Sequence, residues 1–355
     1  MSGYLIGVDG GNTKTDYFLF DTEGRKVDAL RAGTCSHEKL PDRFAGTKRV
    51  LHGLLRDFLS RNDLSADDIT AACFGMAGVD VPRQKRTLEE IVADFGFPRF
   101  VVANDGYLGI KAGTRSGAGV CSISGTATVA VGIGSDGTML QVGGIGMVSG
   151  DNGGGKYLSA QAIQAVYNEA FRFGPATSLS ADLFSLFGVR EVPDLPVAII
   201  EKYELRQVDP AEVVKLLFKH ALMGDGVAGG ILRKSGRSMA RSVAGCVARL
   251  DLPEPVEIVL AGSVWAKAGS PHLFDAFHDC LEELAPRPRA YRVLQIPPAT
   301  GAVLWAMELA CGQAPGDALR ESVVRSVEAY ERQLNVGAAT ATESISPKGS
   351  SSIPG

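Results

Sequence analysis

The 355-residue sequence has little of what usually assigns a chain to a class at first sight. It lacks any apolar run of about 18 residues, the length that predicts a membrane-spanning helix. Its formal net charge is only −4, with both signs interspersed, so neither nucleic acid nor an anionic membrane is expected as the main partner. The first strand pattern begins at residue 4, and we expect neither a leader peptide nor a DNA-binding module before it.

Cysteine is sparse and scattered. No two of the six cysteines lie closer than 31 residues, which fits neither a disulfide framework nor a metal or redox motif. They are Cys35, Cys73, Cys121, Cys246, Cys280 and Cys311. This spacing favours a reducing compartment, and we expect a cytoplasmic protein.

Glycine and apolar residues, by contrast, are plentiful. The chain has 43 glycines and 45% hydrophobic residues, which is typical of a compact α/β protein, and its length predicts two domains. Strand and helix patterns alternate in the first third, strands follow to residue 140, and residues 156–249 are mostly helical. We expect an N-terminal domain at 1–117, a C-terminal domain with a helical insertion at 118–334, and a disordered tail at 335–355.

The most informative short segment is VDGGNTKTDYFLFD at residues 8–21. Strand patterns lie on both sides of its glycine-rich centre, so that centre is a turn between two strands. The turn can be a plain hairpin, because Asn and Gly tolerate positive φ. It can also be a phosphate cradle, because glycine lets backbone N–H groups approach an anion closely.

The same pattern returns in GVCSISGTATVAVGIGSDG at residues 119–137. Gly24 lies 11 residues after Thr13, and Gly137 lies 11 residues after Thr126. The repeat can be the trace of an old duplication and nothing more. We favour a functional interpretation, in which two glycine–threonine turns face each other across a cleft and hold one phosphate chain from both sides.

Two other glycine patterns fail their context tests. GIGSDG at residues 132–137 matches the dinucleotide fingerprint, but it lies between strand patterns rather than before a helix. GDNGGGKY at residues 150–157 matches the P-loop, but Tyr157 stands where that motif needs Ser or Thr for Mg²⁺.

Charged residues follow two of the predicted strands. Asp9 can hold a hydrated Mg²⁺ that binds phosphate, or it can simply cap its own turn. Lys14 can add a cation near the phosphates or point to solvent. Asp105, after the strand at 100–103, can accept a proton from a substrate hydroxyl that attacks a γ-phosphoryl group, or it can be a helix N-cap.

The segment VEIVLAGSVWAKAG at residues 256–269 combines a strand, a Gly-Ser turn and a helix. This geometry suits the adenosine part of a nucleotide, with Gly262 allowing close approach. A plain strand–helix turn is the alternative.

In this order, these motifs resemble those of the sugar kinase and actin-like ATPase superfamily. They are most similar to the N-acetylglucosamine kinase branch of the BadF/BadG/BcrA/BcrD ATPase family, over about residues 5–309. The resemblance implies two ribonuclease H-like (actin-like ATPase) domains, each a mixed β-sheet flanked by helices, with a cleft between them. It also implies ATP and Mg²⁺ as cofactors.

The resemblance extends to individual site residues. It implies Asp105 as the catalytic base and Asp9 as the residue that holds Mg²⁺ through water. The ATP-binding candidates are Gly11, Asn12, Thr13, Lys14, Gly125, Thr126, Ala221, Gly262 and Ser263. The sugar-binding candidates are Ser36, His37, Asp80, Asp105, Gly144, Ile145 and Asp151.

The chain departs from the family pattern around the sugar. Amino-sugar kinases of this type usually carry Asn where this chain has Ser36, Trp where it has Ile145, and Glu where it has Asn152. These changes alter hydrogen bonding and stacking against an N-acetylated ring, so the sequence leaves the acceptor sugar and its hydroxyl open.

We therefore expect an ATP-dependent kinase that phosphorylates a hydroxyl of an amino sugar or related hexose and forms a homodimer. Two alternatives stay open. One is the family's ATPase activator of a radical dehydratase, which carries an iron–sulfur cluster between two subunits. The other is a non-catalytic sugar or nucleotide sensor that retains the kinase fold.

Overall fold

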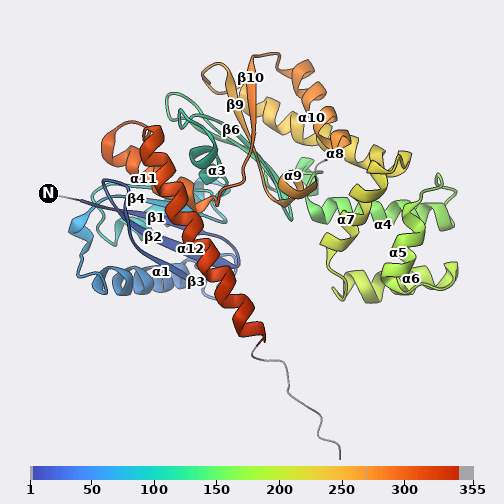
Figure 1. Cartoon of the computed structure of the whole chain (residues 1–355), viewed down its shortest axis with the longest axis horizontal. Coiled ribbons are helices and arrows are strands. Elements are labelled where there is room, and N and C mark those ends of the chain that lie inside the picture. The colour runs from blue at the N-terminus through green and yellow to red at the C-terminus, as the bar shows by residue number, and fades with distance from the viewer. Residues whose placement is uncertain (1–2, 269, 344–355) are drawn as a thin grey trace, which may run out of the picture.

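The computed structural model describes residues 3–268 and 270–343, which form two five-stranded mixed sheets flanked by helices (Figure 1). The first sheet has the order β3-β2-β1-β4-β5. β1 and β2 form the predicted hairpin and pair antiparallel, as do β2 and β3, while β4 and β5 run parallel to β1. Its strands are β1 (Tyr4–Gly10), β2 (Lys14–Asp21), β3 (Lys26–Gly33), β4 (Ile69–Met76) and β5 (Phe100–Ala103).

The second sheet repeats this topology, with the order β10-β9-β6-β7-β8. β6, β7 and β8 are antiparallel neighbours, and β9 and β10 run parallel to β6. The internal repeat therefore reflects two similar folding units, and the expected pair of actin-like domains is confirmed. The strands are β6 (Gly119–Ser124), β7 (Thr128–Ile133), β8 (Met139–Gly143), β9 (Val256–Ala261) and β10 (Arg289–Val293).

Alternation of side chains divides the first sheet between two cores. Ile6 and Val8 face a core completed by α1 (Arg43–Ser60) and α2 (Pro82–Ala93). Leu5 faces the other core, which contains side chains of α3 (Gly106–Gly113) and of both sheets. Because this second core spans both units, α3 and the strands beside it tie the two sheets together.

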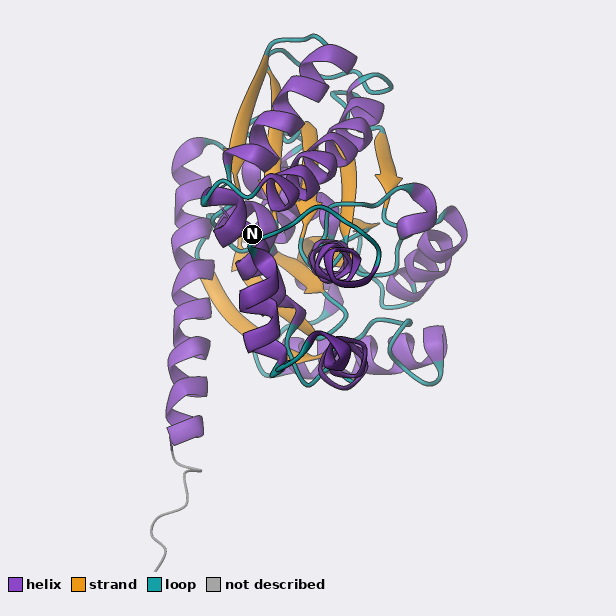
Figure 2. Ribbon diagram, turned by 90° about the vertical axis from the view of Figure 1, so that its right-hand side faces the viewer, coloured by secondary structure: helices purple, strands orange, loops and turns teal. Residues whose placement is uncertain are grey.

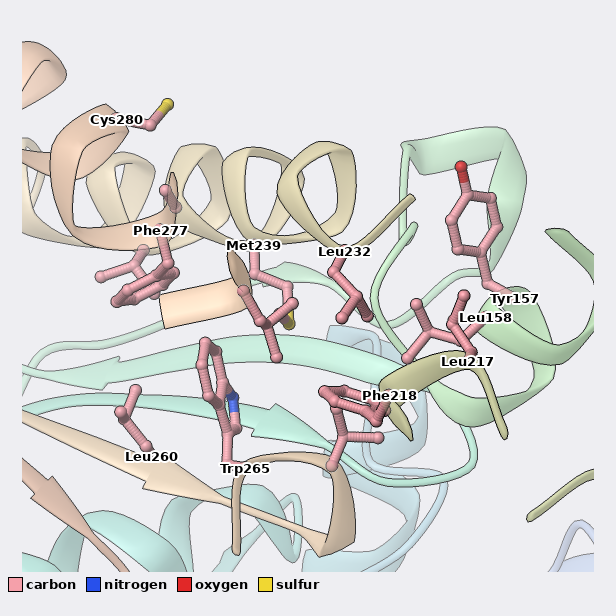
Figure 3. Packing of buried hydrophobic residues seen from close by; sticks show 14 of the residues in the cluster. Tyr157, Leu158, Leu217, Phe218, Leu232, Met239, Leu260, Trp265, Phe277 and Cys280 are labelled. Carbon is pink, nitrogen blue, oxygen red and sulfur yellow. The ribbon is translucent and has the colours of Figure 1, made fainter. Parts of the chain in front are cut away.

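Helices cover the second sheet on the side away from α3. α8 (Gly226–Val247) and α10 (Pro271–Leu284) pack closely together there, and Met239 and Phe277 lie in their shared core (Figure 3). Other helices of this part form a lobe at one end of the molecule (Figure 1). They are α4 (Gly155–Phe171), α5 (Leu179–Phe187), α6 (Leu195–Ala198), the π-helix η4 (Ile199–Glu204) and α7 (Pro210–Leu222).

The end of the chain corrects the predicted domain boundary. α11 (Ala299–Cys311) packs against β1 and β4 of the first sheet, so residues 299–334 do not belong with the second sheet as expected. The packing against α3 is so close that a Cβ on Gly301 would lie 2.0 Å from the carbonyl oxygen of Leu108. The sequence pattern could not predict that α11 packs against α3, because the two helices are nearly 200 residues apart in the chain.

The predicted tail also needs correction. α12 (Asp317–Glu343) runs along one side of the molecule as a long helix and includes residues 335–343, which we expected to be disordered (Figure 2). The sequence did not predict this part of the helix, because small residues such as Ala and Thr give no apolar periodicity. The high helix propensity of Ala was the signal that remained. Residues 344–355 of the predicted tail lie outside the described residues. Among the described helices, none has the length and apolarity to span a bilayer.

Candidate functional site

The turn between β1 and β2 lies at the surface of the molecule. Thr34 donates a hydrogen bond of 2.8 Å to the carbonyl of Gly11, which fixes that carbonyl on the protein side. Within the described residues, the N–H groups of Gly11, Asn12 and Thr13 donate to no other protein group. Unpaired N–H groups on a glycine turn are what a phosphate cradle needs.

The turn between β6 and β7 has a similar character. The carbonyls of Gly125 and Thr126 accept hydrogen bonds of 2.7 and 3.1 Å from the N–H groups of Gly155 and Lys156 at the start of α4. The start of α4 is therefore occupied by protein, which explains why GDNGGGKY is no P-loop. Thr126 itself is exposed, and its N–H has no partner among the described residues.

The predicted adenosine turn meets this second turn. Gly262 has φ +95°, and a Cβ there would lie 2.3 Å from the carbonyl oxygen of Ser124 and 3.0 Å from the backbone nitrogen of Gly125. Ser263 is exposed and begins α9 (Ser263–Ala268). Ala221 is buried near the end of α7, and its carbonyl accepts from His272, which leaves it little surface for a ligand.

This contact predicts a large effect of a methyl group at Gly262. Gly262→Ala should lower the free energy of unfolding by about 1–3 kcal/mol or more and raise KM for ATP, because both the backbone conformation and the Ser124 contact oppose a side chain. Gly137→Ala is the matched control, since Gly137 has φ +80° but no atom within 4 Å of its Cβ position. Chemical denaturation and ATP titration measure both effects. Equal losses of stability and of ATP affinity in the two variants would show that the close contact between Gly262 and Ser124 is not the cause.

Two half-buried carboxylates lie at the end of the first sheet. Burial raises the pKa of Asp9 to about 7, with further contributions from the carboxylates of Asp105 and Asp16. Burial raises the pKa of Asp105 to about 6, and the carboxylate of Asp80 adds to this shift. Asp9 has no hydrogen-bond or ion-pair partner among the described side chains. An uncompensated carboxylate beside a second one fits a hydrated divalent cation, so the residues present suit Mg²⁺.

These pKa values predict the pH dependence of activity. A general base and a cation ligand both act in their ionised forms, so with Asp105 and Asp9 in these expected roles kcat/KM should rise as pH increases through about 6 to 7 and then level off. Below pH 6 the logarithm of kcat/KM should approach a slope of two. A pH profile of initial rates measures this, and a flat profile from pH 5 to 8 would contradict the assignment.

Asp80 connects the two units at the predicted sugar side. One of its carboxylate oxygens accepts hydrogen bonds from Asn104 at 2.9 Å and from Gln141 on β8 at 3.2 Å. Burial raises the pKa of Asp80. The bond from Gln141 crosses between the sheets, so Asp80 is placed where closure of the two units would affect it directly.

His37 is a buried side chain with an unused polar atom. Its ring stacks on Phe44 with a centroid distance of 4.1 Å, and burial lowers its pKa. Within the described residues, Nδ1 of His37 has no hydrogen-bond partner. Ser36 accepts from the N–H of Glu38 at 3.3 Å and so shapes this loop. This nitrogen is enclosed by protein, so it could meet a ligand hydroxyl only after the loop around it moves.

Asp151 organises the loop after β8. Its carboxylate accepts from the N–H of Gly146 at 2.6 Å and from the Ser149 hydroxyl at 2.8 Å. Gly144 has φ +83°, and Ile145 is exposed at 74%. The structure thus engages Asp151 in its own loop and leaves Ile145 without a neighbour to cover it.

Lys14 is committed to carboxylates. Its ammonium lies 3.1 Å from Asp16 and 3.7 Å from Glu331 of α12, and Arg31 joins the same group through Asp16. The cluster fixes α12 against the first sheet, which favours the structural role for Lys14 over a contact with phosphate.

Three side chains of this region were not predicted from the sequence. Asn104 holds both Asp80 and the N–H of Gly106, Gln141 reaches Asp80, and Glu38 accepts from Asn12 at 3.2 Å. A polar residue inside a strand pattern was a usable signal for Gln141. The positions of Glu38 and Asn104 beside predicted site residues were a weaker one.

Comparison with known proteins gives a consistent result. Residues 6–306 match the sequence profile of the BadF/BadG/BcrA/BcrD ATPase family. The chain is 26% identical to N-acetylmuramic acid/N-acetylglucosamine kinase of Clostridium acetobutylicum over 291 residues, which is 78% of this chain and 90% of that protein. It is 23% identical to N-acetyl-D-glucosamine kinase of Dictyostelium discoideum, over 70% of this chain and 80% of that protein.

Solved structures show the same fold. A candidate N-acetylglucosamine kinase from Chromobacterium violaceum superposes with a TM-score of 0.57 at 22% identity, over 85% of this chain and 98% of that one. A ROK hexokinase from Thermus thermophilus gives a TM-score of 0.52 at 16% identity, over 85% of this chain and 98% of that one.

Proposed function

Because this chain belongs to the BadF/BadG/BcrA/BcrD ATPase family, we propose that it is an ATP-dependent kinase that transfers the γ-phosphoryl group to a hydroxyl of an amino sugar or related hexose. The observation that carries this proposal is Asp105, a carboxylate at a strand end with a pKa of about 6, next to Asp9 and Asp80. A base with a pKa near the working pH is well suited to activate a hydroxyl.

Asp105 acts on the acceptor. As the sugar hydroxyl attacks, its oxygen forms the new bond to the γ-phosphorus, the bond from that phosphorus to the bridging oxygen breaks to release ADP, and the hydroxyl proton passes to Asp105. The N–H of Gly106 lowers the pKa of Asp105 and so helps keep it ionised before the reaction. Positioning and charge stabilisation supply most of the rate in such transfers.

The two hairpin turns bind the phosphates of ATP in this proposal. The N–H groups of Gly11, Asn12, Thr13 and Thr126 would donate to phosphate oxygens, with Gly125, Gly262 and Ser263 beside the rest of the nucleotide. Mg²⁺ held by Asp9 through water would neutralise part of the phosphate charge. Closure of the units would exclude water from the reacting atoms.

Acceptor recognition rests on the group around Asp80 and His37. The free carboxylate oxygen of Asp80 would accept a hydrogen bond from a sugar hydroxyl. Nδ1 of His37 is unpaired but enclosed, so it would contact the sugar once the loop around it moves. The curated relatives act, by name, on N-acetylmuramic acid and N-acetylglucosamine. We propose an amino sugar of this kind. Ser36, Ile145 and Asn152 mark the positions at which this chain would select among them.

ADP release tests the proposal. Purified protein is supplied with Mg-ATP and N-acetylglucosamine, N-acetylmuramic acid, N-acetylmannosamine, glucosamine or glucose, with Asp105→Asn as the control. Turnover that one sugar stimulates and that the variant lacks would establish the kinase and its substrate class. ATP binding without stimulation by any of these sugars would contradict the proposed acceptor class.

The two alternative functions, an ATPase activator with an iron–sulfur cluster and a non-catalytic sensor, have less support. A cluster shared at a two-fold axis needs accessible thiols, and five of the six cysteines are buried. A non-catalytic sensor would show no turnover with any sugar, which the same assay detects. We also propose a cytoplasmic location, supported by six unpaired cysteines, and the expected homodimer stays a prediction.

A further inference from the structure

Lys14 shares one face of the first sheet with two carboxylates. Lys14 and Asp16 are two residues apart on β2, so their side chains leave the strand on the same side. Asp9 is paired with Asp16 in the β1–β2 register and lies on that side as well. The turn just before Lys14, residues 11–13, is the proposed phosphate cradle. Lys14 is therefore the cation next to both the cradle and the proposed Mg²⁺ ligand.

α12 covers the same face and adds a third carboxylate. Tyr330 of α12 packs edge-on against Phe18 of β2, with a centroid distance of 5.4 Å. The carboxylate of the next residue, Glu331, lies 3.7 Å from the ammonium of Lys14 and is also hydrogen-bonded to Arg31. An apolar contact thus holds α12 on the sheet, and Glu331 brings a negative charge from the end of the chain to the proposed nucleotide site.

The two cations of this cluster are held with very different strength. Arg31 donates to both carboxylate oxygens of Asp16, at 2.6 and 2.8 Å, and its side chain is 22% exposed. Lys14 lies 3.1 Å from Asp16 and 3.7 Å from Glu331, and its side chain is 48% exposed. A bidentate Arg–carboxylate pair is fixed by its geometry, whereas a half-exposed Lys pair contributes little. Arg31 therefore supplies most of the structural hold, and Lys14 is the cation that can change its partner.

Lys14 also has room to move. Its partner in the β2–β3 register is Gly33, and a Cβ on Gly33 would have no atom within 4 Å among the described residues. Opposed residues of two strands point to the same face, so this open space adjoins Lys14. The charges of Lys14 and Glu331 both act on Asp9. Burial is the main cause of the raised pKa of Asp9, and among the smaller contributions Lys14 lowers this pKa and Glu331 raises it.

We propose that Glu331 is a positioning residue for nucleotide binding, because its carboxylate competes with the phosphates for the ammonium group of Lys14. Lysine binds phosphate as a compact charge on a flexible stem, and a phosphate chain carries more negative charge than one carboxylate. When the phosphates take Lys14, Arg31 still holds Asp16 and Glu331, so the cluster loses little.

α12 thus acts as a restraint on nucleotide affinity. By linkage, a bound nucleotide weakens the contact between Glu331 and Lys14 by the same factor by which Glu331 weakens nucleotide binding. This inference rests on the proposed phosphate site, but it does not depend on the identity of the acceptor.

Calorimetric titration of the full-length protein with Mg²⁺ and adenylyl imidodiphosphate, a non-hydrolysable ATP analogue, tests this. Glu331→Gln should lower the Kd of the analogue about two- to fivefold, the factor that one half-exposed ion pair supplies. Lys14→Gln should raise the Kd about three- to tenfold, because a charged hydrogen bond to phosphate is lost. Glu328→Gln is the matched control. Glu328 lies one turn earlier on α12, pairs with Arg332 at 3.7 Å, and should leave the Kd unchanged.

The variants should fold normally. Val323 and Val327 of α12 are completely buried and keep the helix on the sheet. Arg31 keeps both of its bonds to Asp16 when Glu331 is neutral. Melting curves of the variants check this point.

The double variant separates a positioning role from a general effect of charge. With Lys14 already replaced, Glu331→Gln should no longer change the Kd, because its effect acts through the ammonium group. A general effect of removing negative charge would persist in that background. An unchanged or higher Kd in Glu331→Gln, or a lower Kd that persists without Lys14, would overturn the inference and leave the kinase proposal intact. A wild-type protein that binds no analogue would contradict both.

Discussion

Replacement of Asp105 by Asn should lower kcat for sugar phosphorylation by about 10²–10⁴-fold and leave the affinity for ATP nearly unchanged. The amide keeps the shape of the carboxylate and one acceptor oxygen, but it replaces the other oxygen with an NH2 donor and cannot accept the hydroxyl proton. Steady-state kinetics with saturating Mg-ATP measure the loss, and calorimetric titration of ATP measures the binding. The variant should also lose the part of the pH profile that reflects the pKa of about 6.

A surface substitution separates this effect from a general loss of charge. Asp94→Asn changes an exposed carboxylate that pairs with Lys48 at 2.6 Å, and it should leave kcat unchanged. If Asp105→Asn retained more than a tenth of the wild-type kcat, Asp105 would be a helix N-cap at the start of α3, and the catalytic base would have to be sought elsewhere.

Replacement of Asp9 by Asn should lower the activity of the protein and raise its stability. Activity should fall by about 10²–10³-fold and require higher Mg²⁺, because the proposed ligand of the cation is lost. The folded protein should become more stable at pH 8. A carboxyl group whose pKa is raised to about 7 by folding holds its proton longer in the folded than in the unfolded state. The free energy of unfolding therefore decreases as pH rises from about 4 to 7, and the whole cost is present at pH 8.

Melting temperatures at pH 8 and pH 4 measure the stabilising effect. The increase in Asp9→Asn should be a few degrees at pH 8 and should vanish near pH 4. Asp16→Asn is the matched control, because Asp16 pairs with Asp9 in the β1–β2 register but is bound to Arg31 at 2.6 Å. Its loss leaves Arg31 without that partner and should lower Tm. If Asp9→Asn lowered Tm at pH 8 as well, the carboxylate would be a turn cap rather than a cation site.

Local patterns were sufficient for the individual elements. Continuous apolar residues located β5 at its observed bounds. The glycine–threonine turn repeats in the sequence, and the two sheets that carry the two copies have the same strand order. These features depend on neighbours along the chain, so the sequence carries them directly. The missed β10 is short and lies at a sheet edge, where pairing with β9 decides its structure.

The tertiary structure alone decided how distant segments meet. The return of α11 to β1 and β4 depends on a long-range fit at Gly301, and no local pattern encodes it. The same holds at the site. Gln141 reaches Asp80 from the other sheet, and Lys14 is held by Asp16 and Glu331. The carboxylate of Asp105 raises the pKa of Asp9 only because two strand ends meet. Residue types and turns are thus written in the sequence. Charge balance, burial and partners belong to the folded chain, because they arise between residues that the sequence keeps far apart.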